Sequence, residues 1–330
     1  MKKLYKTDEF CHFNEMRALK AEKKSRRKPK KRKKKNYEAR PQKSINPNLH
    51  HPNEIFAPEI FSIVNNREGF MNFYQQFDNN VWHDKPVYID LSRVNIITPD
   101  ALLCVIASMA NYHVADKYGL IKGNAPKDSH CKQVFLESGF YKYVSSDFQH
   151  VDTENVLSIR DDIIVNPVEA AAVINFIRNK LHITSKITTK AVFTTIMETM
   201  NNVREHAYGS RKNQGWWLMA LPEKESEVIH FSLADNGRGI PETIRKRAIE
   251  QIISKDADLI RAAVLENRSE TKLYYRGNGL PKLKTLIDNK VIKNLHIISK
   301  RGYYYMDEDK VFQLPFEYHG TIIFWDFIKG

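Results

Sequence analysis

The pattern of hydrophobic and polar positions divides the chain into a polar beginning and a long body with regular structure. Apolar residues recur every three or four positions in four stretches of the body, which predicts helices at residues 100–114, 133–138, 167–181 and 188–207. Shorter runs rich in β-branched and aromatic residues predict strands at residues 86–91, 120–123, 216–221, 228–233, 295–298, 303–306, 311–314 and 320–325. Strands and helices in one chain indicate an α/β (α+β) fold.

Turn-forming residues separate the polar beginning from the body. The strings Asn46-Pro47-Asn48 and His50-His51-Pro52-Asn53 have the composition of a linker. We therefore expect three parts, namely a tail over residues 1–49, an α/β domain over residues 50–152 and a second domain over residues 153–330.

The positive charge of the protein is confined to the tail. The formal net charge is +13, yet residues 1–49 hold 18 Lys or Arg against 5 Asp or Glu, and the remaining residues hold 34 of each sign. Residues 23–35 read KKSRRKPKKRKKK, and mutual repulsion without apolar residues predicts disorder in this run.

The basic run is a candidate for binding nucleic acid or another polyanion, since neutralising each phosphate releases counterions. An anionic membrane surface is a second candidate, and a merely solubilising tail is a third. The candidate nucleic-acid-binding residues are Lys23, Lys24, Arg26, Arg27, Lys28, Lys30, Lys31, Arg32, Lys33, Lys34 and Lys35.

Several classes of protein are excluded by composition. No apolar run approaches the roughly 18–20 residues that span a bilayer, and the charged N-terminus lacks the apolar stretch of a secretory signal. Three widely spaced cysteines, Cys11, Cys104 and Cys131, form neither a disulfide framework nor a zinc motif. These features predict a cytoplasmic protein with no transmembrane segment.

Polar residues on the helix predicted at 188–207 are the first candidates for chemistry. Glu198, Asn202 and His206 follow one another at four-residue steps. A helix places such residues in a row on one face, and a row of acid, amide and imidazole suits a metal ion or an activated water.

Two glycine-rich turns are the next candidates. Asp235 precedes Gly237 and Gly239, and two glycines beside a carboxylate permit close approach of the backbone to a ligand. Gly277 and Gly279 open a further predicted helix, where free amides at the helix N-terminus bind phosphate.

Taken in order, these elements resemble the GHKL ATP-binding fold of gyrase B, Hsp90, histidine kinases and MutL. The matching motifs are Glu198-x-x-x-Asn202-x-x-x-His206-Ala207, Asp235-Asn236-Gly237-Arg238-Gly239-Ile240, Gly277-Asn278-Gly279-Leu280 and Gly320-Thr321. The resemblance implies a GHKL, or Bergerat, α/β sandwich over residues 153–330, with ATP and Mg²⁺ as cofactors.

The resemblance implies a role for each matched position. Glu198 stands where ATPases and serine kinases of this family keep a general base. Asn202 is implied to ligate Mg²⁺, because an amide oxygen is a hard ligand. Asp235 is implied to accept a hydrogen bond from the adenine amino group, with Thr321 beside it, and residues 242–276 are implied to form a lid. The other implied cofactor-binding residues are His206, Gly237, Gly239, Ile240, Gly277, Gly279 and Leu280.

Two further resemblances indicate a branch of the family. The string from Asn202 to Tyr208 is most similar to anti-sigma-factor serine kinases, whose motif commonly ends His-Ala-Tyr. Residues 89–103 resemble the central motif of STAS domains, the fold of anti-sigma-factor antagonists. Asp100 falls where regulated STAS domains carry a phosphorylated serine, so the phosphoacceptor is missing.

The sequence leaves two functions open. One is an ATP- and Mg²⁺-binding regulatory ATPase or serine/threonine kinase-like switch coupled to a STAS-like domain, acting on a protein partner or as a homodimer. A histidine autokinase is not expected, because no helix with a His-Glu pair precedes the ATP motifs. The other is a nucleotide-gated module that binds nucleic acid or protein with little or no catalysis.

Overall fold

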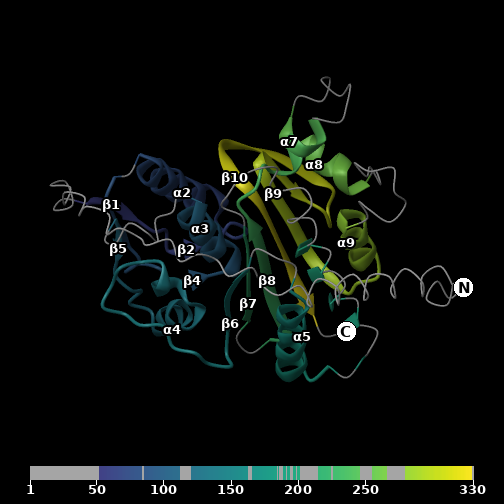
Figure 1. Cartoon of the computed structure of the whole chain (residues 1–330), viewed down its shortest axis with the longest axis horizontal. Coiled ribbons are helices and arrows are strands. Elements are labelled where there is room, and N and C mark those ends of the chain that lie inside the picture. Colours follow the sequence, from purple (N-terminus) through teal and green to yellow (C-terminus); the bar gives the residue numbers. More distant parts are fainter. Residues whose placement is uncertain are drawn as a thin grey trace, which may run out of the picture. The chain divides into compact units, whose positions relative to one another are not determined.

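The computed structural model describes much of the chain beyond the tail (Figure 1). Backbone contacts divide the chain into two units, Met1–Asn46 and Pro47–Gly330. The basic tail lies outside the described residues, which all belong to the second unit. They are residues 52–83, 85–111, 120–162, 166–183, 185, 189–190, 192–193, 196–197, 199–200, 215–223, 226–245, 255–265 and 279–328.

Parallel strands and helices alternate in the first part of the described chain. A three-stranded parallel sheet has the order β1-β3-β5, formed by β1 (Asn53–Phe56), β3 (Val87–Asp90) and β5 (Ile121–Gly123). A separate parallel pair joins β2 (Ile60–Phe61) to β4 (Ile96–Ile97). The helices are α2 (Arg67–Trp82), α3 (Pro99–Asn111) and α4 (Ser129–Ser138), followed by the short 3₁₀ helix η4 (Phe140–Lys142).

Local capping explains where two of these helices begin. The side chain of Asp128 accepts a hydrogen bond from the Cys131 amide at 2.8 Å, so α4 starts before its predicted first residue. The helix ends at Gly139 with a φ of 89°, a typical left-handed cap. Helix α2 is not among the helices predicted from the sequence, and its N-cap Asn66 accepts a hydrogen bond from the Gly69 amide. Its buried residues do follow a helical spacing: Phe70, Met71, Phe73, Tyr74, Phe77 and Val81.

An antiparallel five-stranded sheet dominates the rest of the chain. Its order is β6-β7-β8-β10-β9, and its strands are β6 (Leu157–Asp162), β7 (Trp216–Pro222), β8 (Val228–Asp235), β9 (Ile292–Tyr305) and β10 (Lys310–Ile328). The predicted hairpin of β7 and β8 is confirmed. The helices are α5 (Pro167–Leu181), α7 (Ile240–Arg245), α8 (Asp256–Leu265) and α9 (Gly279–Asp288).

Strand β9 doubles back on itself. The Met306 amide donates to the Leu295 carbonyl at 2.9 Å, although a straight strand would separate these residues by about 36 Å. The rings of His296 and Tyr305 stack with their centroids 4.2 Å apart. Lys300 lies midway with a φ of 55°. The runs predicted at 295–298 and 303–306 are therefore the two arms of one bent strand.

Both faces of the five-stranded sheet are buried. Alternate residues of β7 enter different cores, with Trp216 and Leu218 on one face and Trp217 and Met219 on the other. Helices α5, α8 and α9 contribute to the core on the first face, together with helical residues between 189 and 200. Helix α3 packs against β7, β8 and β10 on the second face (Figure 1). A sheet buried on both faces has continuously apolar strands, as β7 has.

The packing of α3 joins two segments that sequence analysis expected to be separate domains. The hydrophobic core around α3 contains residues from 55–156 together with residues from 217–324. The two segments therefore share one hydrophobic core.

Candidate functional site

Asp235 is the last residue of β8 and lies buried beside the strand that carries Thr321. Its Oδ1 accepts a hydrogen bond from the Gly237 amide at 2.7 Å. Thr321 on β10 is its cross-strand neighbour. Burial raises the pKa of Asp235 to about 7, although the hydrogen bonds from Gly237 and Thr321 act in the opposite direction.

Two glycines allow the backbone around Asp235 to pack closely. Gly239 has a φ of 84°, and a Cβ built there would lie 2.7 Å from Ser299 Oγ. Gly320 has a φ of 117°, and a Cβ built there would overlap the carbonyl oxygen of Asp235. Both positions need glycine for their conformation and for the space it leaves.

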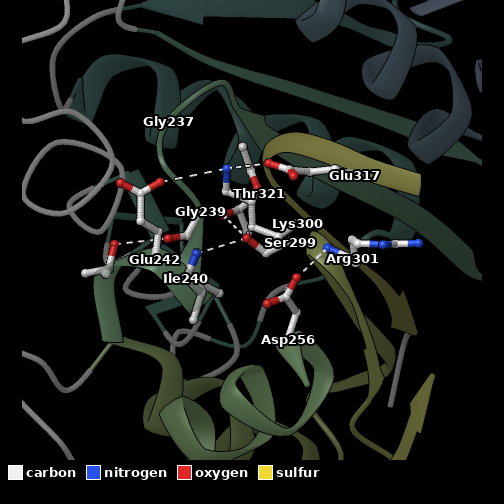
Figure 2. A network of polar contacts seen from close by, with 12 residues as sticks. Gly237, Gly239, Ile240, Glu242, Asp256, Ser299, Lys300, Arg301, Glu317 and Thr321 are labelled. Atoms are coloured by element: carbon white, nitrogen blue, oxygen red, sulfur yellow. Dashed lines mark hydrogen bonds and ion pairs between the residues drawn. The ribbon is translucent and has the colours of Figure 1, made fainter. Parts of the chain in front are cut away.

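Ser299 of β9 joins three parts of this site, and sequence analysis missed it. Its buried hydroxyl accepts a hydrogen bond from the Ile240 amide at 2.9 Å and donates to the Gly320 carbonyl at 2.8 Å. It also lies 3.1 Å from Thr321 Oγ1. Figure 2 shows Ser299 between Ile240 at the start of α7 and Thr321 on β10. A single serine after an apolar run carries no sequence signal for this role.

The bend of β9 also holds the start of α8. The Arg301 amide donates to Asp256 Oδ2 at 3.0 Å (Figure 2). A Cβ built on Gly302 would lie 2.6 Å from the Ala257 nitrogen, so the helix and the strand are in close contact. Lys300 Nζ lies 2.6 Å from Glu317 Oε1 and 3.8 Å from Glu242 Oε2.

Helix α8 lies within the segment that the GHKL resemblance assigns to a lid. Its Arg261 donates through Nε to Asp309 Oδ1 at 2.6 Å, and a second guanidinium nitrogen also bonds this carboxylate. Tyr304 donates to the same carboxylate at 3.0 Å. The hydrogen bond from Arg261 holds the pKa of Asp309 below its ordinary value. A surface ion pair therefore engages this arginine.

The structure brings together five of the predicted site residues, namely Asp235, Gly237, Gly239, Ile240 and Thr321. Gly279 and Leu280 are the first two residues of α9, as the predicted helix requires. Glu198, Asn202, His206 and Gly277 lie outside the described residues. No group of His, Cys, Asp or Glu suited to a metal occurs among the residues that are described.

Asp100, which the STAS resemblance aligns with a phosphorylated serine, is a buried structural carboxylate. It lies in the first turn of α3, where its Oδ2 accepts a hydrogen bond from the Ile63 amide at 2.8 Å. Burial raises the pKa of Asp100 above its ordinary value. The carboxylate thus ties α3 to the loop after β2.

Comparisons with known proteins add no assignment. No protein-family model matches the sequence, and no curated protein is detectably similar to it. Within the described ranges, no helix has the length and apolar character needed to cross a membrane.

Proposed function

We propose that residues 153–330 bind ATP with Mg²⁺ and that the chain is a GHKL-type regulatory switch. The observation that best supports the proposal is the buried carboxylate of Asp235 opposite Thr321. Among the described residues, the Gly237 amide donates to this carboxylate at 2.7 Å, and a carboxylate accepts about four hydrogen bonds. One acceptor position therefore suits the amino group of adenine.

The residues around Asp235 fit a purine. An ionised carboxylate accepts from the exocyclic amino group of adenine, whereas guanine presents an oxygen at the same position. Gly237 and Gly239 bring the backbone close to where the base and ribose would lie. The phosphate end of the site rests on the resemblance, with Gly277 and Gly279 donating amides at the start of α9 and Asn202 holding Mg²⁺.

The proposed reaction is ATP hydrolysis or phosphotransfer to a Ser or Thr hydroxyl of a protein partner. ATP supplies the phosphoryl group. Glu198 acts as the general base that withdraws a proton from water or from the acceptor hydroxyl.

Coupling between the two segments supports a switch. Helix α3 packs on the strands that carry Asp235 and Thr321, so rearrangement at the nucleotide site alters its contacts. In this proposal the STAS-like segment transmits the nucleotide state to a protein partner, and the tail holds the complex on nucleic acid or another polyanion.

Calorimetry with ATP and Mg²⁺, followed by turnover and phosphotransfer assays, tests the proposal. We expect the full chain to bind ATP, Asp235→Asn to weaken binding, and Glu198→Ala to retain binding while losing turnover. Absence of ATP binding by the wild-type chain refutes the proposal. Binding without hydrolysis or phosphotransfer refutes the enzymatic part and favours a nucleotide-gated binding module.

A further inference from the structure

We propose that Ser299 is a positioning residue that orients the hydroxyl of Thr321 and thereby makes the site select adenine over guanine nucleotides. The inference rests on the proposed function, since it concerns the same pocket. Ser299 belongs to none of the motifs that indicate ATP binding, and its contacts alone suggest the role.

The hydrogen-bond inventory of Ser299 limits what its neighbours can do. A serine hydroxyl has one proton and two acceptor lone pairs. The proton of Ser299 is directed to the Gly320 carbonyl at 2.8 Å, and one lone pair accepts from the Ile240 amide at 2.9 Å. Toward Thr321 Oγ1, 3.1 Å away, Ser299 is therefore an acceptor.

Thr321 in turn has one hydroxyl proton, and Ser299 Oγ at 3.1 Å is the acceptor that the geometry gives it. With its proton directed to Ser299, the hydroxyl points into the protein, and the side that remains for a ligand is a lone pair. Above pH 7, where Asp235 is ionised, Thr321 and Asp235 then both present acceptors to the base.

A pair of acceptors discriminates between the purines. The adenine amino group donates to such a site, whereas O6 of guanine faces two acceptors and leaves them unpaired. Without the Ser299 hydroxyl, Thr321 loses the acceptor that holds its proton at 3.1 Å. Its O–H then rotates more readily toward the ligand, where it donates to O6.

Paired calorimetric titrations of ATP and GTP against wild type and Ser299→Ala test the inference. We expect the ratio of the GTP and ATP dissociation constants to fall about tenfold in Ser299→Ala, the equivalent of one hydrogen bond. The ratio is insensitive to the fraction of active protein. Ser299→Cys, with a weaker acceptor, gives an intermediate ratio and answers the question if the alanine variant does not fold.

A double-mutant cycle separates positioning from a purely structural effect. Thr321→Val removes the hydroxyl that Ser299 is proposed to orient, so adding Ser299→Ala in that background leaves the ratio unchanged. Ser232, a fully buried serine of β8, is the matched control, and Ser232→Ala retains the wild-type ratio.

Two results overturn the inference. One is an unchanged ratio in both Ser299→Ala and Ser299→Cys, and the other is an equal change with and without the Thr321 hydroxyl. If the wild-type protein binds neither nucleotide, the proposed function itself fails. That outcome differs from a protein that prefers ATP but whose ratio of dissociation constants is the same with and without the Ser299 hydroxyl, which refutes only this inference.

Discussion

Gly320 packs directly against Asp235, so closely that a Cβ built on Gly320 would overlap the Asp235 carbonyl oxygen. Gly320 immediately precedes Thr321, which the β8–β10 pairing places opposite Asp235. Backbone packing and the candidate recognition of a base thus depend on the same few atoms.

Gly320→Ala is expected to destabilise the protein by at least about 2 kcal/mol. The left-handed φ of 117° costs roughly 1–2 kcal/mol for a residue with a Cβ, and the overlap with Asp235 adds to it. Urea unfolding followed by circular dichroism measures the loss. Gly139→Ala is the matched control, because Gly139 has a φ of 89° but its nearest atoms lie 3.7 Å from a built Cβ. Equal losses in the two variants would show that the close approach to Asp235 is unimportant.

Asp235→Asn is expected to stabilise the protein above pH 7 while weakening ATP binding. The folded-state pKa of about 7 lies above the ordinary value of 3.8, so ionisation costs stability as pH rises through this range. The variant gains up to about 4 kcal/mol at pH 8.5 and little at pH 4. Urea unfolding across this pH range measures the difference.

Asp90→Asn is the control, because the pKa of Asp90 is lowered in the folded protein whereas that of Asp235 is raised. Burial disfavours the charge of Asp90, but hydrogen bonds from Asn124 and Ser92 outweigh it and lower its pKa. Its contribution is present above the ordinary pKa and is lost as pH falls through the lowered value. Asp90→Asn therefore loses stability at pH 8.5. A gain from Asp235→Asn that does not vary with pH would contradict the assignment of Asp235.

The pair of His230 and Asp326 is expected to stabilise the protein most at mildly acidic pH. Their Nδ1 and Oδ1 atoms lie 2.6 Å apart. Burial disfavours the charged imidazole, but the hydrogen bond and charge of Asp326 outweigh it and raise the pKa of His230. The contribution of the pair to stability is complete below the unfolded pKa of about 6.5 and is lost as pH rises through the folded pKa of His230.

Asp326→Asn should cost about 1 kcal/mol more at pH 5.5 than at pH 8.5, as measured by urea unfolding. An equal cost at both pH values would assign the effect to the Asn294 hydrogen bond with Asp326.

Tyr74→Ala in α2 is expected to weaken the five-stranded sheet as well as its own segment. The buried Tyr74 ring lies 5.3 Å from Phe316 and 5.9 Å from Tyr318, which lead into Gly320. Loss of a buried aromatic ring costs about 3–5 kcal/mol. Hydrogen exchange should show lower protection in α3 and in β7 and β8 together.

Tyr74→Phe is the control for this experiment, because it keeps the ring and removes the hydroxyl that contacts Ser108. It should cost about 1 kcal/mol. Unchanged protection of β7 and β8 in Tyr74→Ala would mean that the two segments unfold independently.

Deletion of residues 1–45 is expected to abolish salt-sensitive binding to DNA or RNA. The remaining chain has nearly balanced charges, because the excess lies in residues 1–49. For the full chain, the logarithm of affinity should fall with the logarithm of salt at a slope near −0.9 per neutralised phosphate. Fluorescence anisotropy at several salt concentrations measures the slope. Retention of affinity after deletion would refute a role for the tail.

Local chemistry determined much of the fold. Helix α5 has its predicted bounds, because Pro167 suits a first turn and apolar periodicity follows it. Helix α4 ends at Gly139 because a left-handed cap favours glycine. The hairpin of β7 and β8 was likewise predicted from two apolar runs and a charged turn. Each of these signals lies within a few neighbouring residues, so the helix bounds and the hairpin can be predicted without the tertiary structure.

The candidate site was predictable where residues form a compact motif. Asp235, Gly237 and Gly239 lie next to one another in the chain, and their types indicate a turn that approaches a ligand. Thr321 was added by resemblance alone, and the β8–β10 register then brings it opposite Asp235. The motif residues that are not described remain predictions.

Other features depend on contacts between residues far apart in sequence. Ser299 meets Ile240 and Gly320 only because β9 lies beside β10 and the start of α7. The bend of β9 at Lys300 and the packing of α3 on the sheet also have no local signature. Sequence by itself determined the local elements and the motif around Asp235, since these depend on neighbouring residues. Tertiary structure alone decided the shared core and the position of Ser299, because burial and hydrogen-bond partners are set by distant segments that fold together.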